Sequence, residues 1–471
     1  MTYSPRRRSP LAGLLFIFLV GAAGCGGRSV IGQQTGAAGA AGNGTAGVGG
    51  RGGGGGFGNS AGTGNSAGTG NSAGTGNSAG TGNSAGTGDV CLGVGGGAPA
   101  GVLAFQPAVE YATQRNPLLV KLGDLNGDGK PDLVVINRYA MNQGGAGGSG
   151  ASGSGAGGTT GAAGGPQTGS MSVFLSGAGA GLTGPQNYLA GAAPNAVAIG
   201  DLNGDGKADV AVTNGQDLGV LFNSGDGTLL APVNLATGTI PIGISIGDLN
   251  GDGKADIAVA NIGDGDVAVF LSLGNGTFVS ANYPAGSSPN SLAIGDLNGD
   301  GRADLAVAST GGVAVLLNNG NGTFAGAVMY GAGTRPHSVA IADLNGDGKL
   351  DLTFANANIN GVSVMLNLGD GTFAAAVDYA YSDYVSALVV GDLNGDGKPD
   401  LAAIDIGSAP CAVVAVWLNV GSGTFGAPFS LVVNPVVQNE DLSVGDLNGD
   451  GKLDLVVPGP DGVGVLLNAG H

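Results

Sequence analysis

The sequence has little of what acid–base catalysis or zinc binding by imidazole requires. Among its 471 residues it has two histidines, three cysteines and one tryptophan. Histidine is the side chain best suited to proton exchange near neutral pH and the commonest metal ligand, so little of that chemistry is expected here. Basic residues are also scarce: 16 Lys and Arg face 34 Asp and Glu, for a net charge of −18. Because phosphate neutralisation needs clustered basic side chains, this composition argues against nucleic acid as a partner.

Glycine, by contrast, is in excess and divides the chain. It supplies 101 of the 471 residues, where an average protein contains about 7%. Glycine is densest before residue 101 and again in residues 141–170. We therefore predict three parts: residues 1–25, residues 26–100, and a folded domain over residues 101–471 that carries a low-complexity insertion at 141–170.

Residues 1–25 have the pattern of an export signal. Three arginines at positions 6–8 precede an apolar run over residues 11–20, which is too short to span a bilayer as a helix. The four residues AAGC, ending at Cys25, resemble the lipobox of bacterial lipoproteins. The resemblance implies that Cys25 is lipidated and that the protein is exported and lipid-anchored to the outer membrane, at the cell surface or on its periplasmic face. The alternative is an ordinary cleaved signal peptide with an incidental cysteine.

Residues 26–100 have the composition of a tether. The hexapeptide NSAGTG occurs five times in tandem between Asn59 and Gly88. Such a segment cannot bury enough apolar surface to offset its backbone entropy, so we predict that it is disordered. A glycine-rich chain of this length has a typical span of roughly 45–50 Å.

One nine-residue loop of the pattern DLNGDGxxD recurs after residue 101. Its seven copies begin at Asp124, Asp201, Asp248, Asp296, Asp343, Asp392 and Asp446. The start-to-start spacings are 77, 47, 48, 47, 49 and 54 residues, and removing the 30-residue insertion reduces 77 to 47. A period of about 48 residues suits a propeller blade.

Short apolar runs around each loop favour strands over helices. They are rich in Val, Ile and Ala, are bounded by Gly, Asn and Asp, and show no helical period. Four such runs in each of seven periods predict an all-β fold, a seven-bladed β-propeller of four-stranded blades. The last period lacks a fourth run, whereas residues 103–111 form an extra run before the first loop. We therefore expect the N-terminal strand to complete and close the last blade, which removes an exposed edge.

The repeated loop has the ligand pattern of a calcium site. Oxygen-bearing side chains occupy positions 1, 3, 5 and 9, and position 7 offers a backbone carbonyl, as in the first half of an EF-hand loop. Position 12 is apolar in every copy and strands flank the loop, so it is not an EF-hand. We predict about seven structural Ca²⁺ ions, with Lys and Arg binding through the backbone carbonyl, held by Asp124, Asn126, Asp128, Lys130, Asp132; Asp201, Asn203, Asp205, Lys207, Asp209; Asp248, Asn250, Asp252, Lys254, Asp256; Asp296, Asn298, Asp300, Arg302, Asp304; Asp343, Asn345, Asp347, Lys349, Asp351; Asp392, Asn394, Asp396, Lys398, Asp400; and Asp446, Asn448, Asp450, Lys452, Asp454.

A hydrogen-bonded turn without metal is the alternative interpretation of each loop, because Asp, Asn and Gly also favour Asx-turns. Three aspartates in each of seven loops account for 21 of the 34 acidic residues. These carboxylates would repel one another without a cation, which favours calcium. The basic side chain at position 7 is expected to point outward and to relieve part of that repulsion.

These loops, together with the string Phe425-Gly426-Ala427-Pro428, resemble the FG-GAP/VCBS repeats of bacterial surface proteins and of integrin α-subunit propellers. The resemblance covers residues 101–471 and implies a calcium-loaded propeller whose ligands engage the face away from the metal loops. Carried over to this sequence, that face holds the 141–170 insertion and Arg115. It also holds the candidate ligand residues Asn116, Asn195, Asn290, Arg335, His337, Asp383, Tyr384, Asn439 and Glu440. A solvated loop residue is the alternative for each.

Other conspicuous side chains are expected to be structural. The phenylalanines of the GTF strings (Phe278, Phe324, Phe373, Phe425) and Trp417 are predicted core residues. Cys91 and Cys411 are candidates for a disulfide, since an exported protein meets an oxidising compartment.

Three functions remain open at this stage. The first is a non-enzymatic, monomeric binding or adhesion module for a protein or glycan, held at the envelope by the N-terminal lipid. The second is a propeller enzyme that acts on polysaccharide in the manner of a lyase. The third is a structural surface repeat without a discrete ligand. The absence of any catalytic cluster outside the metal loops favours the first, and fold alone does not decide among them.

Overall fold

The computed structural model describes residues 103–114, 116–138, 168–177, 181–331, 335–405, 411–435, 441–459 and 461–470. The predicted signal peptide, the tether and Cys91 lie outside the described residues, and so does almost all of the 141–170 insertion. Strand β4 begins at Thr168, so the last three residues that the sequence assigns to the insertion belong to a strand instead. Within the described ranges, no helix is long and apolar enough to cross a membrane.

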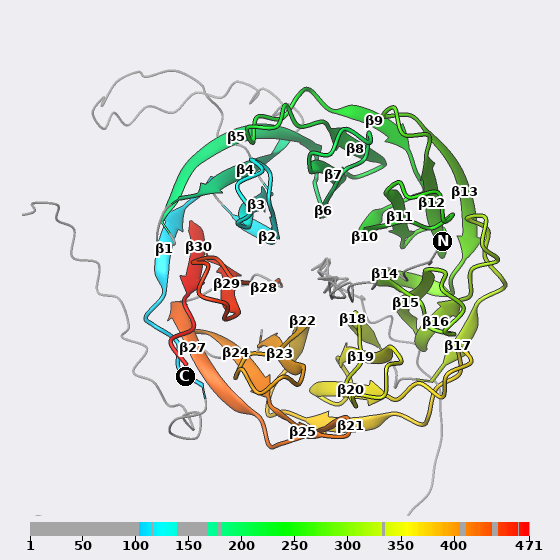
Figure 1. Cartoon of the computed structure of the whole chain (residues 1–471), viewed down its shortest axis with the longest axis vertical. Coiled ribbons are helices and arrows are strands. Elements are labelled where there is room, and N and C mark those ends of the chain that lie inside the picture. The colour runs from blue at the N-terminus through cyan, green and yellow to red at the C-terminus, as the bar shows by residue number, and fades with distance from the viewer. Residues whose placement is uncertain are drawn as a thin grey trace, which may run out of the picture. The chain divides into compact units, whose positions relative to one another are not determined.

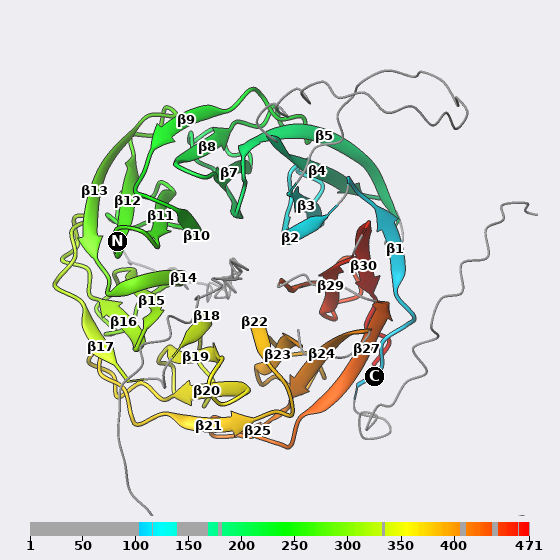
Figure 2. The ribbon, with the colours of Figure 1, turned by 180° about the vertical axis from the view of Figure 1, so that it is seen from behind.

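Strands form seven four-stranded antiparallel sheets arranged as a ring (Figures 1 and 2), which confirms the predicted seven-bladed propeller. In the first three blades the strands are β2 (Pro117–Gly123), β3 (Asp132–Asn137), β4 (Thr168–Ser176) and β5 (Leu182–Ala192); β6 (Ala196–Gly200), β7 (Asp209–Thr213), β8 (Asp217–Leu221) and β9 (Val233–Ala236); and β10 (Pro241–Gly247), β11 (Asp256–Asn261), β12 (Asp266–Ser272) and β13 (Phe278–Pro284).

The remaining blades repeat this order, with one extra hairpin in the sixth. Their strands are β14 (Ser287–Gly295), β15 (Asp304–Thr310), β16 (Gly312–Leu316) and β17 (Val328–Tyr330); β18 (Pro336–Ala342), β19 (Asp351–Asn356), β20 (Gly361–Met365) and β21 (Val377–Ala380); β22 (Val385–Gly391), β23 (Asp400–Asp405), β24 (Cys411–Trp417) and β27 (Phe429–Pro435), with the hairpin β25 (Asn419–Gly421) and β26 (Thr424–Phe425); and β28 (Ser443–Gly445), β29 (Asp454–Pro458) and β30 (Gly462–Leu466).

The last blade is completed by the first strand of the chain. Strand β1 (Val109–Ala112) pairs antiparallel with β30, with Val109 opposite Val465 and Tyr111 opposite Val463. The sheet order β1-β30-β29-β28 therefore supplies the fourth strand that the C-terminal repeat lacks. This confirms the predicted closure and leaves the ring without an open edge between its first and last blades.

Each blade runs from the centre of the ring to its rim. The first strands, β2, β6, β10, β14, β18, β22 and β28, lie innermost, and fourth strands such as β5, β13 and β27 lie outermost (Figure 1). Because successive strands are antiparallel, the connections between first and second strands all emerge on one face, together with those between third and fourth strands. The nine-residue loops therefore share one face, which we call the loop face.

Branched and aromatic side chains fill the spaces between blades. Tyr283 of β13 packs edge-on against Phe324 of the next blade, with ring centroids 5.2 Å apart, and Tyr330 packs in the same way on Phe373 at 5.1 Å. Phe324 and Phe373 are buried, and Trp417 is fully buried. The core roles predicted for these aromatic residues are confirmed.

A glycine precedes six of the seven aspartate loops and permits close packing around the axis, whereas Ala342 precedes the loop that begins at Asp343. A Cβ on Gly123 would lie 2.7 Å from Cγ2 of Ile199 in the next blade, and a Cβ on Gly445 would lie 2.8 Å from Cδ1 of Leu122. Contacts this short are not tolerated between rigid atoms. Glycine thus lets a branched side chain of one blade seat against the backbone of its neighbour, including across the junction of last and first blades.

Candidate functional site

The aspartate loops on the loop face share one hydrogen-bond pattern, here given for the loop that begins at Asp296. Oδ1 of Asp296 accepts the backbone N–H groups of Gly299 at 2.7 Å and Asp300 at 3.1 Å, and its Oδ2 accepts that of Gly301 at 2.8 Å. Asp300 in turn accepts the N–H of Arg302 at 3.0 Å. Position 1 thereby fixes the turn, and the glycines at positions 4 and 6 adopt positive φ angles in every copy (for example 76° at Gly299).

The aspartate at position 9 is buried beneath its loop. Asp304 is 0% exposed; its Oδ2 accepts the N–H of Leu297 at 2.9 Å and its Oδ1 accepts the N–H of Asn318 at 2.7 Å. Burial raises the pKa of Asp304 to about 6, with a smaller contribution from the charges of Asp300 and Asp296. The same burial raises the pKa to about 6 at Asp209, Asp256, Asp351 and Asp400, and raises it at Asp132 and Asp454.

In five of the seven loops the basic residue at position 7 pairs with the position-5 aspartate of its own loop. Lys130 and Lys452 instead donate to the backbone carbonyls of Gly177 and Gly470. Nζ of Lys254 lies 2.8 Å from Oδ2 of Asp252, and Nζ of Lys398 lies 2.7 Å from Oδ2 of Asp396. These pairs are substantially exposed and add little to stability. They match the outward orientation that the sequence indicates.

The chemistry of the loops suits a hard cation, since every side-chain donor at positions 1, 3, 5 and 9 is an oxygen. The position-9 carboxylate lies in a buried site, and burial is the main cause of its raised pKa, to which the neighbouring carboxylates add. In the described residues, however, no three acidic, histidine or cysteine side chains converge closely enough to form a metal cage. The calcium sites therefore stay a prediction.

A polar residue that closes the third strand ties the loops of the first six blades to the next blade. Nδ2 of Asn318 donates to the carbonyl of Leu249 in the preceding blade's loop at 2.7 Å and to that of Ala303 in its own loop at 2.7 Å. Asn223, Asn367, Asn419 and Asn468 repeat this bond to the preceding blade, and in the third blade Ser272 does so through its hydroxyl. The recurrence of Asn or Ser at this position is visible in the sequence, but its partner is not.

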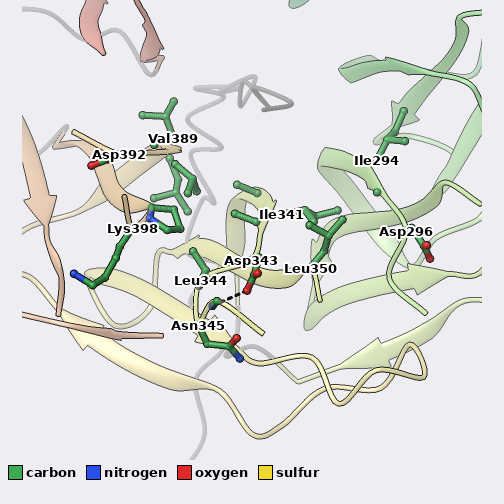
Figure 3. Close-up of a pocket in the computed structure, with 18 of the residues that line it drawn as sticks. Ile294, Asp296, Ile341, Asp343, Leu344, Asn345, Leu350, Val389, Asp392 and Lys398 are labelled. Atoms are coloured by element: carbon green, nitrogen blue, oxygen red, sulfur yellow. Dashed lines mark hydrogen bonds between the residues drawn. The ribbon is translucent and has the colours of Figure 1, made fainter. Parts of the chain in front are cut away.

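A cavity of about 870 Å³ opens on the loop face within the ring of innermost strands. Its apolar lining includes Ile294, Ile341 and Val389, from the first strands of three consecutive blades, and Leu350 (Figure 3). Four position-1 aspartates, those of the third to sixth blades, also line it, and Arg302 and Lys398 add two cationic side chains. Sequence reasoning missed this cavity, although a branched apolar residue in the innermost strand of each repeat was the available signal.

The candidate ligand residues lie at the ends of strands opposite the loop face, and none of those described lines this cavity. The structure brings three of them together. Nδ2 of Asn290 lies 3.5 Å from Nδ1 of His337 and donates to its carbonyl at 3.3 Å, while the His337 ring packs edge-on against Tyr384 at 5.4 Å. Burial, with the charge of Arg335, lowers the pKa of His337. The three side chains thus link three consecutive blades.

The other candidate ligand residues make separate contacts, except that Asp383 bonds to the backbone of Tyr384. Asn195 donates to the carbonyl of Pro241 at 2.9 Å, so it joins two blades. Asn116 is exposed with a φ of 57°, and Arg335 is exposed. Asp383 accepts the backbone N–H of Tyr384 at 2.9 Å. Arg115, Asn439 and Glu440 lie outside the described residues.

Family models match most of the repeat region. One model, described as an FG-GAP-like repeat, matches residues 201–259, 248–307, 296–354, 343–403 and 392–457. A second, described as an FG-GAP repeat, matches residues 120–156. A search of the curated proteins found no match.

Several solved structures resemble the chain. A lectin of Agrocybe aegerita that recognises non-reducing terminal N-acetylglucosamine is 22% identical, with a TM-score of 0.48, 69% of this chain covered and 82% of that one. A periplasmic gluconolactonase of Pseudomonas aeruginosa is 18% identical, with a TM-score of 0.45 and coverages of 72% and 88%. A protein from Lactobacillus plantarum is 16% identical, with a TM-score of 0.46 and coverages of 70% and 87%. We draw no functional argument from likenesses at this level.

Proposed function

Because the chain belongs to the FG-GAP repeat family, we propose that it is a calcium-stabilised propeller that acts as a non-enzymatic binding module. The observation that carries this proposal is the cavity of about 870 Å³ on the loop face. A concave site with an apolar wall and a few polar groups at its mouth is the usual form of a ligand-binding pocket. The ligand is a protein or glycan that presents an apolar group to Ile341 and its neighbours.

The polar groups around the cavity favour binding over acid–base chemistry. The carboxylate oxygens of the position-1 aspartates accept hydrogen bonds from backbone N–H groups. Asp343, for example, accepts those of Gly346, Asp347 and Gly348 at 2.8, 3.1 and 2.8 Å. A carboxylate engaged in this way is poorly placed to take a proton from a substrate. This supports a binding role, with a polysaccharide-acting enzyme as the second candidate.

Calcium is part of the proposal as a structural ion. Two features support it, the oxygen-only donor set and the crowding of three carboxylates in each loop. At tenfold excess over its Kd, one bound ion contributes about 1.4 kcal/mol. Elemental analysis of purified protein should find about seven calcium ions per chain, the number of loops, and removal of calcium should lower the Tm. Fewer than about four ions, or an unchanged Tm, would contradict this role.

The ligand site is tested by blocking the cavity. Glycan and peptide arrays should reveal ligands whose binding is lost in Ile341→Lys, which places a charge on the apolar wall. Val377→Lys is the matched control, because Val377 lies on the outermost strand of the same blade and is 54% exposed. Loss of binding in His337→Ala instead would place the ligand on the opposite face. Turnover on a polysaccharide panel would favour the enzyme.

We further propose that the protein is exported and held at the outer membrane through a lipid on Cys25. The support is the basic start, the short apolar run and the AAGC string of the sequence.

A further inference from the structure

Two oxygen atoms in the second blade are buried without a hydrogen-bond partner. They are Oδ1 of Asn214 and Oδ1 of Asp217, at the two ends of the connection between β7 and β8. The Asn214 residue is only 5% exposed. A buried acceptor without a donor is costly to the folded protein, so this pair calls for a donor that the chain itself does not provide.

The third blade shows the same side chains with their hydrogen bonds made. There Nδ2 of Asn261 donates to Oδ1 of Asp266 at 2.8 Å, and Nδ2 of Asn282 donates to its Oδ2 at 2.9 Å. Asn214, Asp217 and Asn234 occupy the corresponding places in the second blade.

The difference arises from the length of the connection. It runs from 214 to 217 in the second blade but from 261 to 266 in the third. In the shorter one the backbone N–H of Asn214 donates to the carbonyl of Asp217 at 2.8 Å. The tight turn thus leaves the two side chains without the bond that their counterparts make.

A cavity of about 220 Å³ lies beside Asn214, between the fourth strand of the first blade and the outer strands of the second. Its lining is formed by Leu189, Ala190, Gly191, Asn214, Leu221, Pro232 and Asn234. Asp217 and Leu221 lie on the same face of β8, since alternate strand residues point the same way. A Cβ on Gly191 would lie 2.5 Å from Oδ1 of Asn214, so glycine is needed to leave that amide its place.

The lining holds no basic side chain and combines the amide oxygen of Asn214 with aliphatic walls. The Asp217 carboxylate lies on the same face of β8 as the lining residue Leu221. We propose that this cavity binds a primary alkylammonium group, such as the side chain of a lysine or the end of an aliphatic amine. An ammonium carries three donors and no acceptor, which suits two acceptors that lack donors. Leu189, which is 65% exposed, and Pro232 contact the alkyl stem at the mouth.

The test uses n-butylammonium as the probe, added to the full chain in saturating calcium and followed by NMR titration. The wild type should bind it saturably, and n-butanol, which lacks the charge, should bind much more weakly. Asp217→Asn should weaken binding about tenfold, equivalent to about 1.4 kcal/mol. Asp266→Asn, the counterpart whose oxygens are already paired in the third blade, should leave binding unchanged.

A second variant keeps the proposal open to refutation if Asp217→Asn does not fold. Leu189→Ala removes an exposed side chain and should weaken butylammonium binding with little effect on the Tm. Stronger binding of N-acetyl-lysine N-methylamide than of butylammonium would point to a protein lysine, and stronger binding of 1,4-diaminobutane to a free amine. Three results would overturn the proposal. They are the absence of saturable binding, equal effects of Asp217→Asn and Asp266→Asn, and a crystal structure with only water at the two oxygens.

Discussion

Nζ of Lys121 lies 3.3 Å from Oδ2 of Asp441, although the two residues are 320 positions apart in the chain. Both are buried, and the same carboxylate oxygen accepts the backbone N–H of Val120 at 2.9 Å. At the junction between the fifth and sixth blades, Ser338 occupies the position equivalent to Asp441. Its Oγ accepts the backbone N–H of Leu388 at 3.4 Å. The junction of the last and first blades therefore has a charged version of a contact that Ser291 and Ser338 make through a neutral hydroxyl.

Breaking this pair should destabilise the ring strongly. Lys121→Met leaves the Asp441 carboxylate buried without its cation and should lower the free energy of unfolding by about 3–5 kcal/mol. Urea denaturation measures this loss. The double variant Lys121→Ala, Asp441→Ser imitates the neutral contact of the interior blades and should recover much of the stability. If the double variant is as unstable as Lys121→Met, the neutral contact does not replace the ion pair, which would contradict this prediction.

The side-chain amide of Asn367 should contribute measurably to the contact between the fourth and fifth blades. It donates to the carbonyls of Leu297 at 2.8 Å and Leu350 at 2.7 Å. Asn367→Ala leaves a buried carbonyl without its donor and should lower the free energy of unfolding by about 1–3 kcal/mol. Asn367→Ser should lower it less, because Ser272 makes the equivalent bond at 3.1 Å. Equal losses in both variants, measured in urea, would contradict this role.

Stability in the absence of calcium should fall as the pH rises. Burial raises the pKa of five position-9 aspartates from 3.8 to about 6 in the folded chain (Asp209, Asp256, Asp304, Asp351, Asp400). A raised folded-state pKa means that the folded chain holds these protons more tightly than the unfolded chain does. The stabilisation is complete below pH 3.8 and is lost as the pH passes through about 6.

Thermal melts of calcium-free protein between pH 4 and pH 7 measure this dependence. The Tm should decrease across that range, whereas calcium-loaded protein should not show the decrease, because a bound cation favours the ionised carboxylates. A Tm that rises steadily with pH in calcium-free protein would contradict the prediction.

Cys25→Ala should release the protein from membranes. Without the thiol no lipid is attached, so fractionation of expressing bacteria should find the variant in soluble fractions and the wild type with the outer membrane. Cys91→Ala alters a cysteine outside the lipobox-like string, so this variant should remain in the membrane fraction like the wild type. Soluble wild-type protein would favour an ordinary cleaved signal peptide.

The fold was largely predictable because its signals are local and repeated. The period between aspartate loops predicts the blades, and the run over residues 103–111 predicts the strand β1 that completes the last blade. The cavity on the loop face was not predictable, since its walls come from innermost strands of separate blades and take shape only when the ring closes.

The roles of single, unrepeated residues were harder to predict from the sequence. Lys121 and Asp441 occur once each in positions that are otherwise small or apolar, and Asp441 directly follows Glu440, which the family resemblance had singled out instead. Likewise, the unpaired Asn214 follows from a connection that is two residues shorter than that of the next blade. A repeat pattern describes what the blades share and gives no information about such departures.

Strand β1 gives the molecule a definite response to mechanical tension. The chain before residue 103 enters the ring through β1, which is hydrogen-bonded to β30 in the blade at the other end of the sequence. A pull from that side is therefore transmitted first to the β1–β30 pairing, and only after this strand detaches does it reach β2. The ring should rupture at its junction under traction while the six blades formed by consecutive segments keep their internal pairing.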